Sequence, residues 1–221
     1  MPTAATTELD TALAARSTAT VSDALDRLGL PGSAHGLTPL RDGQRLAGRA
    51  YTVRYVPAGA IAGTVGDYLD DVAPGQVVVL DNQGRTDATV WGDILTAVAS
   101  ERGVAGSVIW GVCRDVTRAL TTGYPIYSAG RFMRTGKDRV EVADVQVPVA
   151  AGDARVAPGD LVLADDDGVV IVPTGHEEAV LELAVRIEEG EDRILADALE
   201  LGSLGAARAR HGYHTLQRRD A

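Results

Sequence analysis

Two apolar segments with strand character flank a segment with helical periodicity near the middle of the chain. The run Gly106–Cys113 is rich in β-branched and aromatic residues, which is typical of a buried strand. A shorter apolar run at residues 76–80 precedes it, and residues 92–99 between them place apolar side chains at helical spacing. A strand, helix, strand order over this distance returns the second strand beside the first in a parallel pair. The pattern predicts an α/β fold.

The remaining elements are predicted from turn residues and apolar spacing on either side of this unit. Two short helices span about residues 7–28, and Thr20 is the expected N-cap of the second. A C-terminal helix begins at about residue 175, ends near 199 and leads into a tail that reaches 221. Further strands are expected at residues 47–56, 125–127, 145–149, 161–164 and 169–172, with a hairpin turn at 165–168. A chain of 221 residues that is 45% hydrophobic can bury one core without disulfides, so residues 1–221 are expected to form a single domain.

Three charged residues stand at the ends of the central elements. Asp93 falls in the first turn of the predicted helix, whereas Arg114 and Asp115 follow the buried strand, at the edge where open α/β sheets usually bind ligands. The free N–H groups of a first helical turn attract carboxylates and phosphates. Two carboxylates suit Mg²⁺ or Mn²⁺, and an arginine suits a substrate carboxylate. A structural salt bridge at a strand end explains the same spacing equally well.

Six segments, in order along the chain, resemble the RraA-like family: Ser17–Leu25, Asp81–Asp87, Trp91–Asp93, Arg102–Gly106, Gly111–Val116 and Asp165–Pro173. The resemblance covers residues 15 to 190 approximately and is more specific than any single motif. The family includes class II aldolases that act on 4-hydroxy-4-methyl-2-oxoglutarate and 4-carboxy-4-hydroxy-2-oxoadipate. Resemblance to this family also implies a swivelling β/β/α fold and assembly as a homotrimer or a dimer of trimers.

The resemblance also implies roles for the three charged residues. In the aldolase branch an Asp, twenty intervening residues and an Arg-Asp pair form the active site, and Asp93, Arg114 and Asp115 match this pattern. Asp115 would bind the metal directly, Asp93 would bind it mainly through water, and Arg114 would contact the substrate. The backbone residues implied to bind the pyruvoyl group are Gly92, Asp93, Ile94 and Leu95.

The leading functional hypothesis is a divalent-metal-dependent aldolase that cleaves a 4-hydroxy-2-oxo acid to pyruvate through an enolate stabilised by the metal. Decarboxylation of oxaloacetate is the close alternative, because it passes through the same enolate. A different class of function is a non-catalytic regulator that binds a ribonuclease or another protein, as the family name implies. The complete set of Asp93, Arg114 and Asp115 favours catalysis.

The net charge, the apolar runs and the lysine content of the chain argue against some partners and mechanisms. The formal charge of −10 argues against a nucleic-acid partner, and the chain has neither an apolar run of transmembrane length nor a basic leader, so we expect a cytoplasmic enzyme without membrane contact. The chain has 20 Arg but one lysine, Lys137, in a polar stretch, which favours metal-assisted over Schiff-base chemistry. In the segment 131–139, Arg131, Arg134 or Lys137 is a candidate to recognise the far carboxylate of a dicarboxylic substrate, although a solvated loop explains the segment as well.

Overall fold

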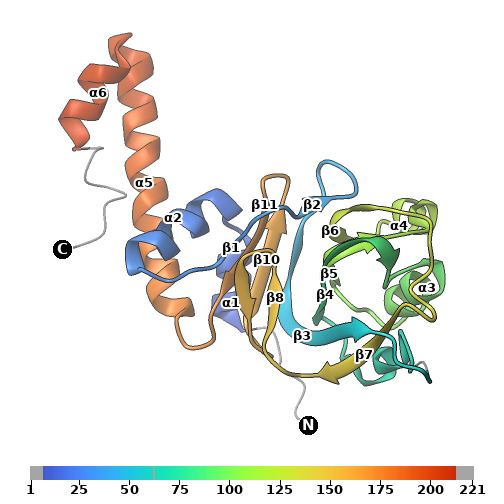
Figure 1. Cartoon of the computed structure of the whole chain (residues 1–221). Helices are drawn as coiled ribbons and strands as arrows, with labels where there is room; N and C mark the ends of the chain where they lie inside the picture. The colour runs from blue at the N-terminus through green and yellow to red at the C-terminus, as the bar shows by residue number, and fades with distance from the viewer. Residues whose placement is uncertain (1–6, 62, 213–221) are drawn as a thin grey trace.

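The computed structural model describes residues 7–61 and 63–212 and shows a mixed α/β architecture (Figure 1). Its helices are α1 (Glu8–Ala14), α2 (Thr18–Leu28), α3 (Asp93–Glu101), α4 (Val116–Thr122), α5 (Glu177–Leu201) and α6 (Leu204–His211), with a 3-10 helix η1 at Asp67–Asp71. Its strands are β1 (Ser33–Ala34), β2 (Thr38–Pro39), β3 (Leu46–Pro57), β4 (Val77–Thr89), β5 (Gly106–Cys113), β6 (Ile126–Arg131), β7 (Val140–Val145), β8 (Val149–Ala151), β9 (Ala154–Val156), β10 (Leu161–Asp165) and β11 (Gly168–Val172).

The centre of the large sheet is parallel. Strands β3, β4, β5 and β6 lie side by side in that order, and Val77 of β4 pairs with Ala50 on one side and Gly106 on the other. Helix α3 connects β4 to β5, and α4 connects β5 to β6. The predicted strand, helix, strand unit is therefore confirmed. Because β4 and β5 are parallel, the residues that follow them lie at the same edge of the sheet.

The other part of the sheet contains the predicted hairpin. Strands β10 and β11 pair antiparallel, and β10 also pairs antiparallel with β3. At the turn, the Asp165 carboxylate accepts hydrogen bonds from the backbone N–H and the hydroxyl of Thr18 and from the N–H of Asp167. Asp165 thereby ties the start of α2 to the hairpin.

Helices α1, α2 and α5 cover the hairpin and bury a cluster that includes Leu13, Val21, Leu25 and Ile187 against β10 and β11. Figure 1 shows α5 extending beyond the sheet, with α6 folded back beside its end. None of the described helices combines the length and the apolar composition needed to span a membrane. Residues 213–221 of the predicted tail lie outside the described residues.

Two local predictions are wrong. The N-cap of the second helix is Ser17, not Thr20, because the Ser17 hydroxyl accepts the hydrogen bond from the Thr20 N–H and the helix begins three residues earlier than predicted. The expected strand at 145–149 is interrupted, because Gln146 has a φ of 54° and the chain turns between β7 and β8. Alternating valines at 145, 147 and 149 suggested one strand, but two short strands form instead.

Strand β4 is longer than the predicted run at 76–80. It continues to Thr89, with shifts in its pairing to β5 after Asp81 and after Arg85. The irregularity follows from positive φ angles of 56° at Gln83 and 67° at Gly84, which bulge the strand. This extension carries β4 to the edge at which the three charged residues lie.

A buried ion-pair cluster joins helices α1 and α5 to strand β3. Arg49 of β3 donates to the Asp10 carboxylate of α1, with Nε to Oδ2 at 3.1 Å, and its Nη1 lies 2.5 Å from Oε1 of Glu177 at the start of α5. The side chains of Arg49, Asp10 and Glu177 are 13%, 4% and 10% exposed. Burial alone would raise the pKa of Glu177, but the hydrogen bond from Arg49 lowers it below its ordinary value.

Replacing Arg49 with Met is expected to lower the free energy of unfolding by about 3–5 kcal/mol at pH 7, because it leaves two buried carboxylates without their partner. The matched control is Arg54→Met. Its ion pair with Asp144 is nearly half exposed, so we expect a loss of about 1 kcal/mol or less. Urea unfolding measures both values, and equal losses in the two variants would contradict the role given to Arg49.

The same cluster predicts a dependence on pH. A carboxylate whose pKa is lowered by folding stabilises the protein above its unfolded pKa of about 4.3, and this contribution is lost as the pH falls through the lower folded pKa. The native protein should therefore lose more stability than Arg49→Met between pH 7 and about pH 3.5, because Glu177 has lost its stabilising partner in the variant. An identical loss in both proteins would show that other groups control acid unfolding.

Candidate active site

The structure brings Asp93, Arg114 and Asp115 together at one edge of the parallel sheet. Asp93 is the first residue of α3, and Arg114 and Asp115 lie between the end of β5 and the start of α4. The Arg114 N–H donates to the carbonyl of Trp91 at 3.0 Å, which joins the segment after β5 to the segment before α3. A backbone contact therefore fixes the two halves of the predicted motif relative to each other.

Gly92 lets the Asp115 carboxylate approach the start of α3. A Cβ built on Gly92 would lie 2.9 Å from Asp115 Oδ2 and 3.4 Å from Arg114 Nε, so any larger residue would displace one of these groups. Asp115 itself has φ 54° and ψ 36°, a left-handed conformation that stores backbone strain in a residue other than glycine. Arg114 Nε lies 3.3 Å from Asp115 Oδ2. The site thus holds a carboxylate and a guanidinium against a helix N-terminus.

Two hollows meet at Asp93. The first has a volume of about 410 Å³, within the range of small-molecule sites, and the residues expected to bind the substrate all line it: Gly92, Asp93, Ile94, Leu95 and Arg114. The second, of about 450 Å³, is lined by Asp93, Asp115, Thr117, Arg118, Thr121 and Thr122. Asp93 and Asp115 therefore face a common space, and Asp93 also borders the space that Arg114 lines.

Asp93 and Asp115 supply two carboxylates, which are suitable as part of the ligand set of a metal ion. Asp93 and Asp115 are 46% and 43% exposed, and Arg118 Nε lies 4.0 Å from Asp93 Oδ2. Within residues 7–61 and 63–212, no group of three or more His, Cys, Asp or Glu side chains is arranged to hold a metal ion. An ion that takes few protein oxygens and keeps waters or substrate oxygens, as Mg²⁺ does, fits two carboxylates better than an ion that needs a complete protein cage.

Trp91, which lines the first hollow, is held in place by hydrogen bonds and ring stacking. Trp91 is almost fully buried, and its Nε1 donates to the Thr96 hydroxyl at 2.9 Å, which donates in turn to the Gly92 carbonyl at 2.9 Å. The Trp91 ring stacks on Tyr124 with 5.9 Å between centroids. Burial raises the pKa of Tyr124, so its phenol stays neutral and serves packing. These contacts fix the N-terminal turn of α3.

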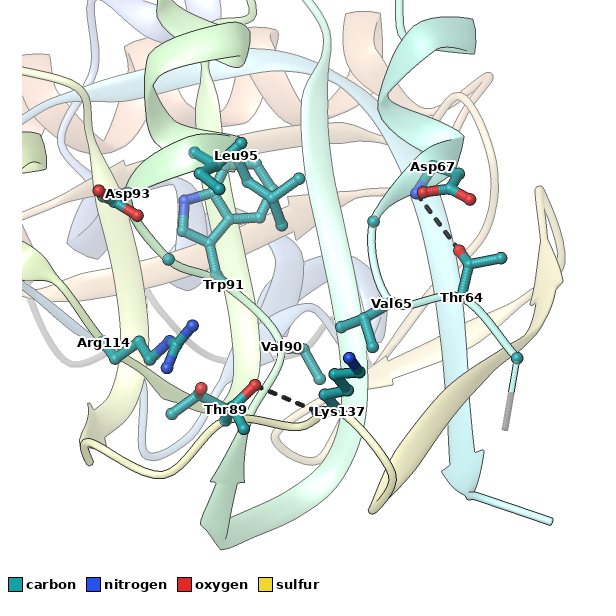
Figure 2. Close-up of a pocket in the computed structure, with 15 residues that line it drawn as sticks. Thr64, Val65, Asp67, Thr89, Val90, Trp91, Asp93, Leu95, Arg114 and Lys137 are labelled. Atoms are coloured by element: carbon teal, nitrogen blue, oxygen red, sulfur yellow. Dashed lines mark hydrogen bonds between the residues drawn. The ribbon is translucent and has the colours of Figure 1, made fainter. Parts of the chain in front are cut away.

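Several lining residues were not predicted from the sequence. Residues 63–67, Thr89 and Thr135 complete the first hollow, and Figure 2 shows Thr64, Val65 and Asp67 on the side away from Asp93. The loop is held by the hydrogen bond from the Tyr55 hydroxyl to the Val65 carbonyl at 2.6 Å. No local pattern identifies this loop, because it reaches the site through contacts with residues distant in sequence.

Of the three cations suggested for the far carboxylate, Lys137 alone lines the first hollow. The Arg131 guanidinium donates to the Leu40 carbonyl at 2.6 Å, and that of Arg134 lies 5.6 Å from the centre of the Phe132 ring. Both arginines are therefore engaged in other contacts.

The chain is similar in sequence to a known protein family and to named bacterial proteins. The family model described as RraA-like, Aldolase/RraA, matches residues 18–171. Protein DlpA from Legionella pneumophila is 36% identical over 198 residues, which cover 88% of this chain but 32% of DlpA, so the chain spans about a third of that relative. A protein of Halalkalibacterium halodurans named "Putative 4-hydroxy-4-methyl-2-oxoglutarate aldolase" is 31% identical over 183 residues, 81% of this chain and 85% of that protein.

A solved structure agrees with the sequence comparisons. Streptomyces coelicolor RraAS2, described as an unusual member of the RNase ES inhibitor RraA protein family, superposes with a TM-score of 0.78 at 32% identity and covers 86% of this chain and 96% of that one. The mixed sheet with its flanking helices is thus the RraA fold. On the match over residues 18–171 and this likeness, the chain belongs to the RraA-like family.

Proposed function

We propose that this chain is a divalent-metal-dependent lyase that cleaves a 4-hydroxy-2-oxo acid and releases pyruvate. The observation that supports this most is the convergence at Gly92, where Asp115 Oδ2 and Arg114 Nε lie 2.9 and 3.4 Å from the position of an added Cβ. A carboxylate, a guanidinium and a helix N-terminus at one point suit an anionic substrate beside a cation. The names of relatives that contain "aldolase" agree with this reading.

The first turn of α3 and Arg114 would bind the reacting end of the substrate. The N–H groups of Asp93, Ile94 and Leu95 belong to the turn that has no preceding helical carbonyl to bind, so they can donate to the 1-carboxylate. Arg114 lines the same hollow and can donate to the 2-oxo oxygen. The pyruvoyl group would thus be held on two sides.

Asp115, Asp93 and Arg114 would each have a role in cleavage of the C3–C4 bond. A divalent ion held by Asp115, with Asp93 acting through water, would supply a Lewis acid that polarises the 2-oxo group. When a water molecule takes the proton of the 4-hydroxyl, C4 becomes a carbonyl, the C3–C4 bond breaks, and its electron pair stays with the pyruvate fragment as an enolate. Arg114 stabilises the negative charge on the enolate oxygen, and protonation at C3 completes pyruvate.

Decarboxylation of oxaloacetate is a second activity that the same site would support. It forms the same enolate without removal of a proton from a distal hydroxyl. The described residues that line the first hollow include no histidine, and their carboxylates are those of Asp67 and Asp93. This lining favours a reaction that needs no strong protein base near C4.

Replacing Asp115 with Ala is expected to abolish Mg²⁺- or Mn²⁺-dependent pyruvate release, because the direct ligand is lost. Steady-state rates on 4-hydroxy-2-oxo acids and on oxaloacetate measure the loss and rank the two reactions, while metal titration calorimetry checks the binding. Asp70→Ala, at an exposed carboxylate outside both hollows, is the control. Normal turnover in Asp115→Ala would reject the assignment, and an inert native protein across the panel would favour the non-catalytic regulator that binds a protein partner.

Replacing Gly92 with Ala is expected to lower kcat/KM by about 100-fold while the protein stays folded, because the new methyl group must displace Asp115 or Arg114. Gly205→Ala is the matched control, since an added Cβ in α6 meets no atom within 4 Å. Circular dichroism and thermal unfolding verify the fold of both variants. Undiminished kcat/KM in Gly92→Ala would show that the close approach of Asp115 has no catalytic role.

The proposal also predicts that no imine forms with the protein. Incubation with pyruvate and borohydride should leave the mass of Lys137 peptides unchanged, whereas a chelator should stop pyruvate release. Peptide mass spectrometry and the rate assay give the two readings. A reduced pyruvate adduct on Lys137, together with activity that resists chelation, would assign the chemistry to the Schiff-base class instead.

A further inference from the structure

Arg118 is a cation in the second hollow that the Asp93, Arg114 and Asp115 motif does not include. It lies on α4, and it lines this hollow together with Asp93, Asp115 and three threonines. Among the described residues of this lining, Arg118 is the one that carries a positive charge. Its Nε lies 4.0 Å from Asp93 Oδ2. A guanidinium so placed acts on whatever the two carboxylates bind.

Helix α4 fixes the position from which Arg118 reaches Asp93. The Arg118 N–H donates to the Asp115 carbonyl at 3.3 Å, and the Thr122 hydroxyl donates to the Arg118 carbonyl at 3.0 Å. Helix α4 packs beside α3, whose first residue is Asp93 (Figure 1). The ion pair therefore connects the starts of the two helices that carry the proposed metal ligands.

The Asp93 carboxylate has few other constraints on its direction. Within residues 7–61 and 63–212 it accepts no hydrogen bond, and the N-cap of α3 is Gly92, which has no side chain to share that role. Asp115 differs, because its Oδ2 lies 3.3 Å from Arg114 Nε. Arg118 is thus the charged group of the described chain that can hold Asp93 in one orientation.

The charge of Arg118 affects how Asp93 can serve a cation. A divalent ion coordinated directly by Asp93 Oδ2 would lie close to the guanidinium, and the two positive charges would repel each other. A water molecule between the ion and Asp93 increases the distance between these charges and so reduces the repulsion. Arg118 therefore favours contact between Asp93 and the ion through water.

We propose that Arg118 is a positioning residue that keeps the Asp93 carboxylate out of direct coordination to the metal. It thereby weakens binding of the ion alone and leaves positions around the ion for water and the 2-oxo acid. The inference rests on the proposed function for the role of Asp115 as the direct ligand. Arg118 itself contacts neither the substrate nor the reacting atoms.

Binding of Mn²⁺ without substrate tests this role without turnover. Electron paramagnetic resonance of the free ion measures the Kd, and water proton relaxation counts the exchanging waters on the bound ion. Arg118→Met should bind Mn²⁺ about 5- to 10-fold more tightly, with one fewer exchanging water, because Asp93 becomes a direct ligand. The difference should shrink as ionic strength rises. Arg186→Met, at an exposed position of α5 outside both hollows, makes the same change of charge and should bind Mn²⁺ like the native protein.

A double-mutant cycle shows whether Arg118 acts through Asp93. In the Asp93→Asn background, Arg118→Met should change the Kd for Mn²⁺ by less than about 2-fold, because no carboxylate is released to bind the ion. Arg118→Lys keeps the charge, so its Kd and its number of exchanging waters should stay near the native values. An unchanged Kd in Arg118→Met, or an equal gain of affinity in both backgrounds, would overturn the proposal.

The same measurements distinguish this inference from the proposed function. The proposed reaction would be refuted, and the role of Arg118 retained, if Mn²⁺ binding depended on Arg118 and Asp93 but no 2-oxo acid released pyruvate. Normal pyruvate release with no effect of Arg118→Met on Mn²⁺ binding would refute the role of Arg118 alone. Where turnover occurs, Arg118→Met should lower kcat and require less Mn²⁺ for half-maximal activity, a combination that a loss of folded protein does not produce.

Discussion

The parallel pairing of β4 with β5 is the constraint on which the candidate site depends. It places the residues after both strands at one edge of the sheet, and the hydrogen bond from the Arg114 N–H to the Trp91 carbonyl at 3.0 Å then fixes their spacing. Glycine at position 92 leaves the space into which the Asp115 carboxylate projects. The strained backbone of Asp115 is tolerated because the flanking strand and helix determine its position. The charged groups of the site follow from this backbone arrangement.

The sequence alone predicts the strand, helix, strand unit and the positions of three charged residues at the ends of its elements, because both follow from local sequence patterns. Apolar runs bounded by Gly and Pro mark β4, α3 and β5, and the strand ends locate Asp93, Arg114 and Asp115. Prediction from the sequence failed where the structure depends on an unusual backbone conformation or on contacts between residues that are distant in sequence. The alternating apolar pattern of residues 145–149 predicts one strand, but the positive φ of Gln146 divides this segment between β7 and β8. Likewise, the loop at 63–67 borders the first hollow through tertiary packing, which no periodicity reveals.

The two hollows that meet at Asp93 divide the proposed chemistry between them. Asp115 borders one and Arg114 the other, so a cation and a keto acid can occupy adjacent positions with Asp93 between them. Arg114 and Arg118 partly neutralise the two carboxylates, which lowers the cost of placing negative charges side by side and leaves room for an anionic substrate. Lys137 adds a positive charge away from these groups.

The proposed reaction requires that a divalent ion and a 2-oxo acid meet between Asp115 and the first turn of α3. A crystal structure with Mn²⁺ and oxalate, a mimic of the pyruvate enolate, tests it most directly, since the anomalous signal of manganese locates the ion. We expect the ion at about 2.2 Å from an Asp115 carboxylate oxygen and oxalate within hydrogen-bonding distance of Arg114 and the N–H groups of α3. Manganese bound away from Asp115, or oxalate away from α3, would contradict it.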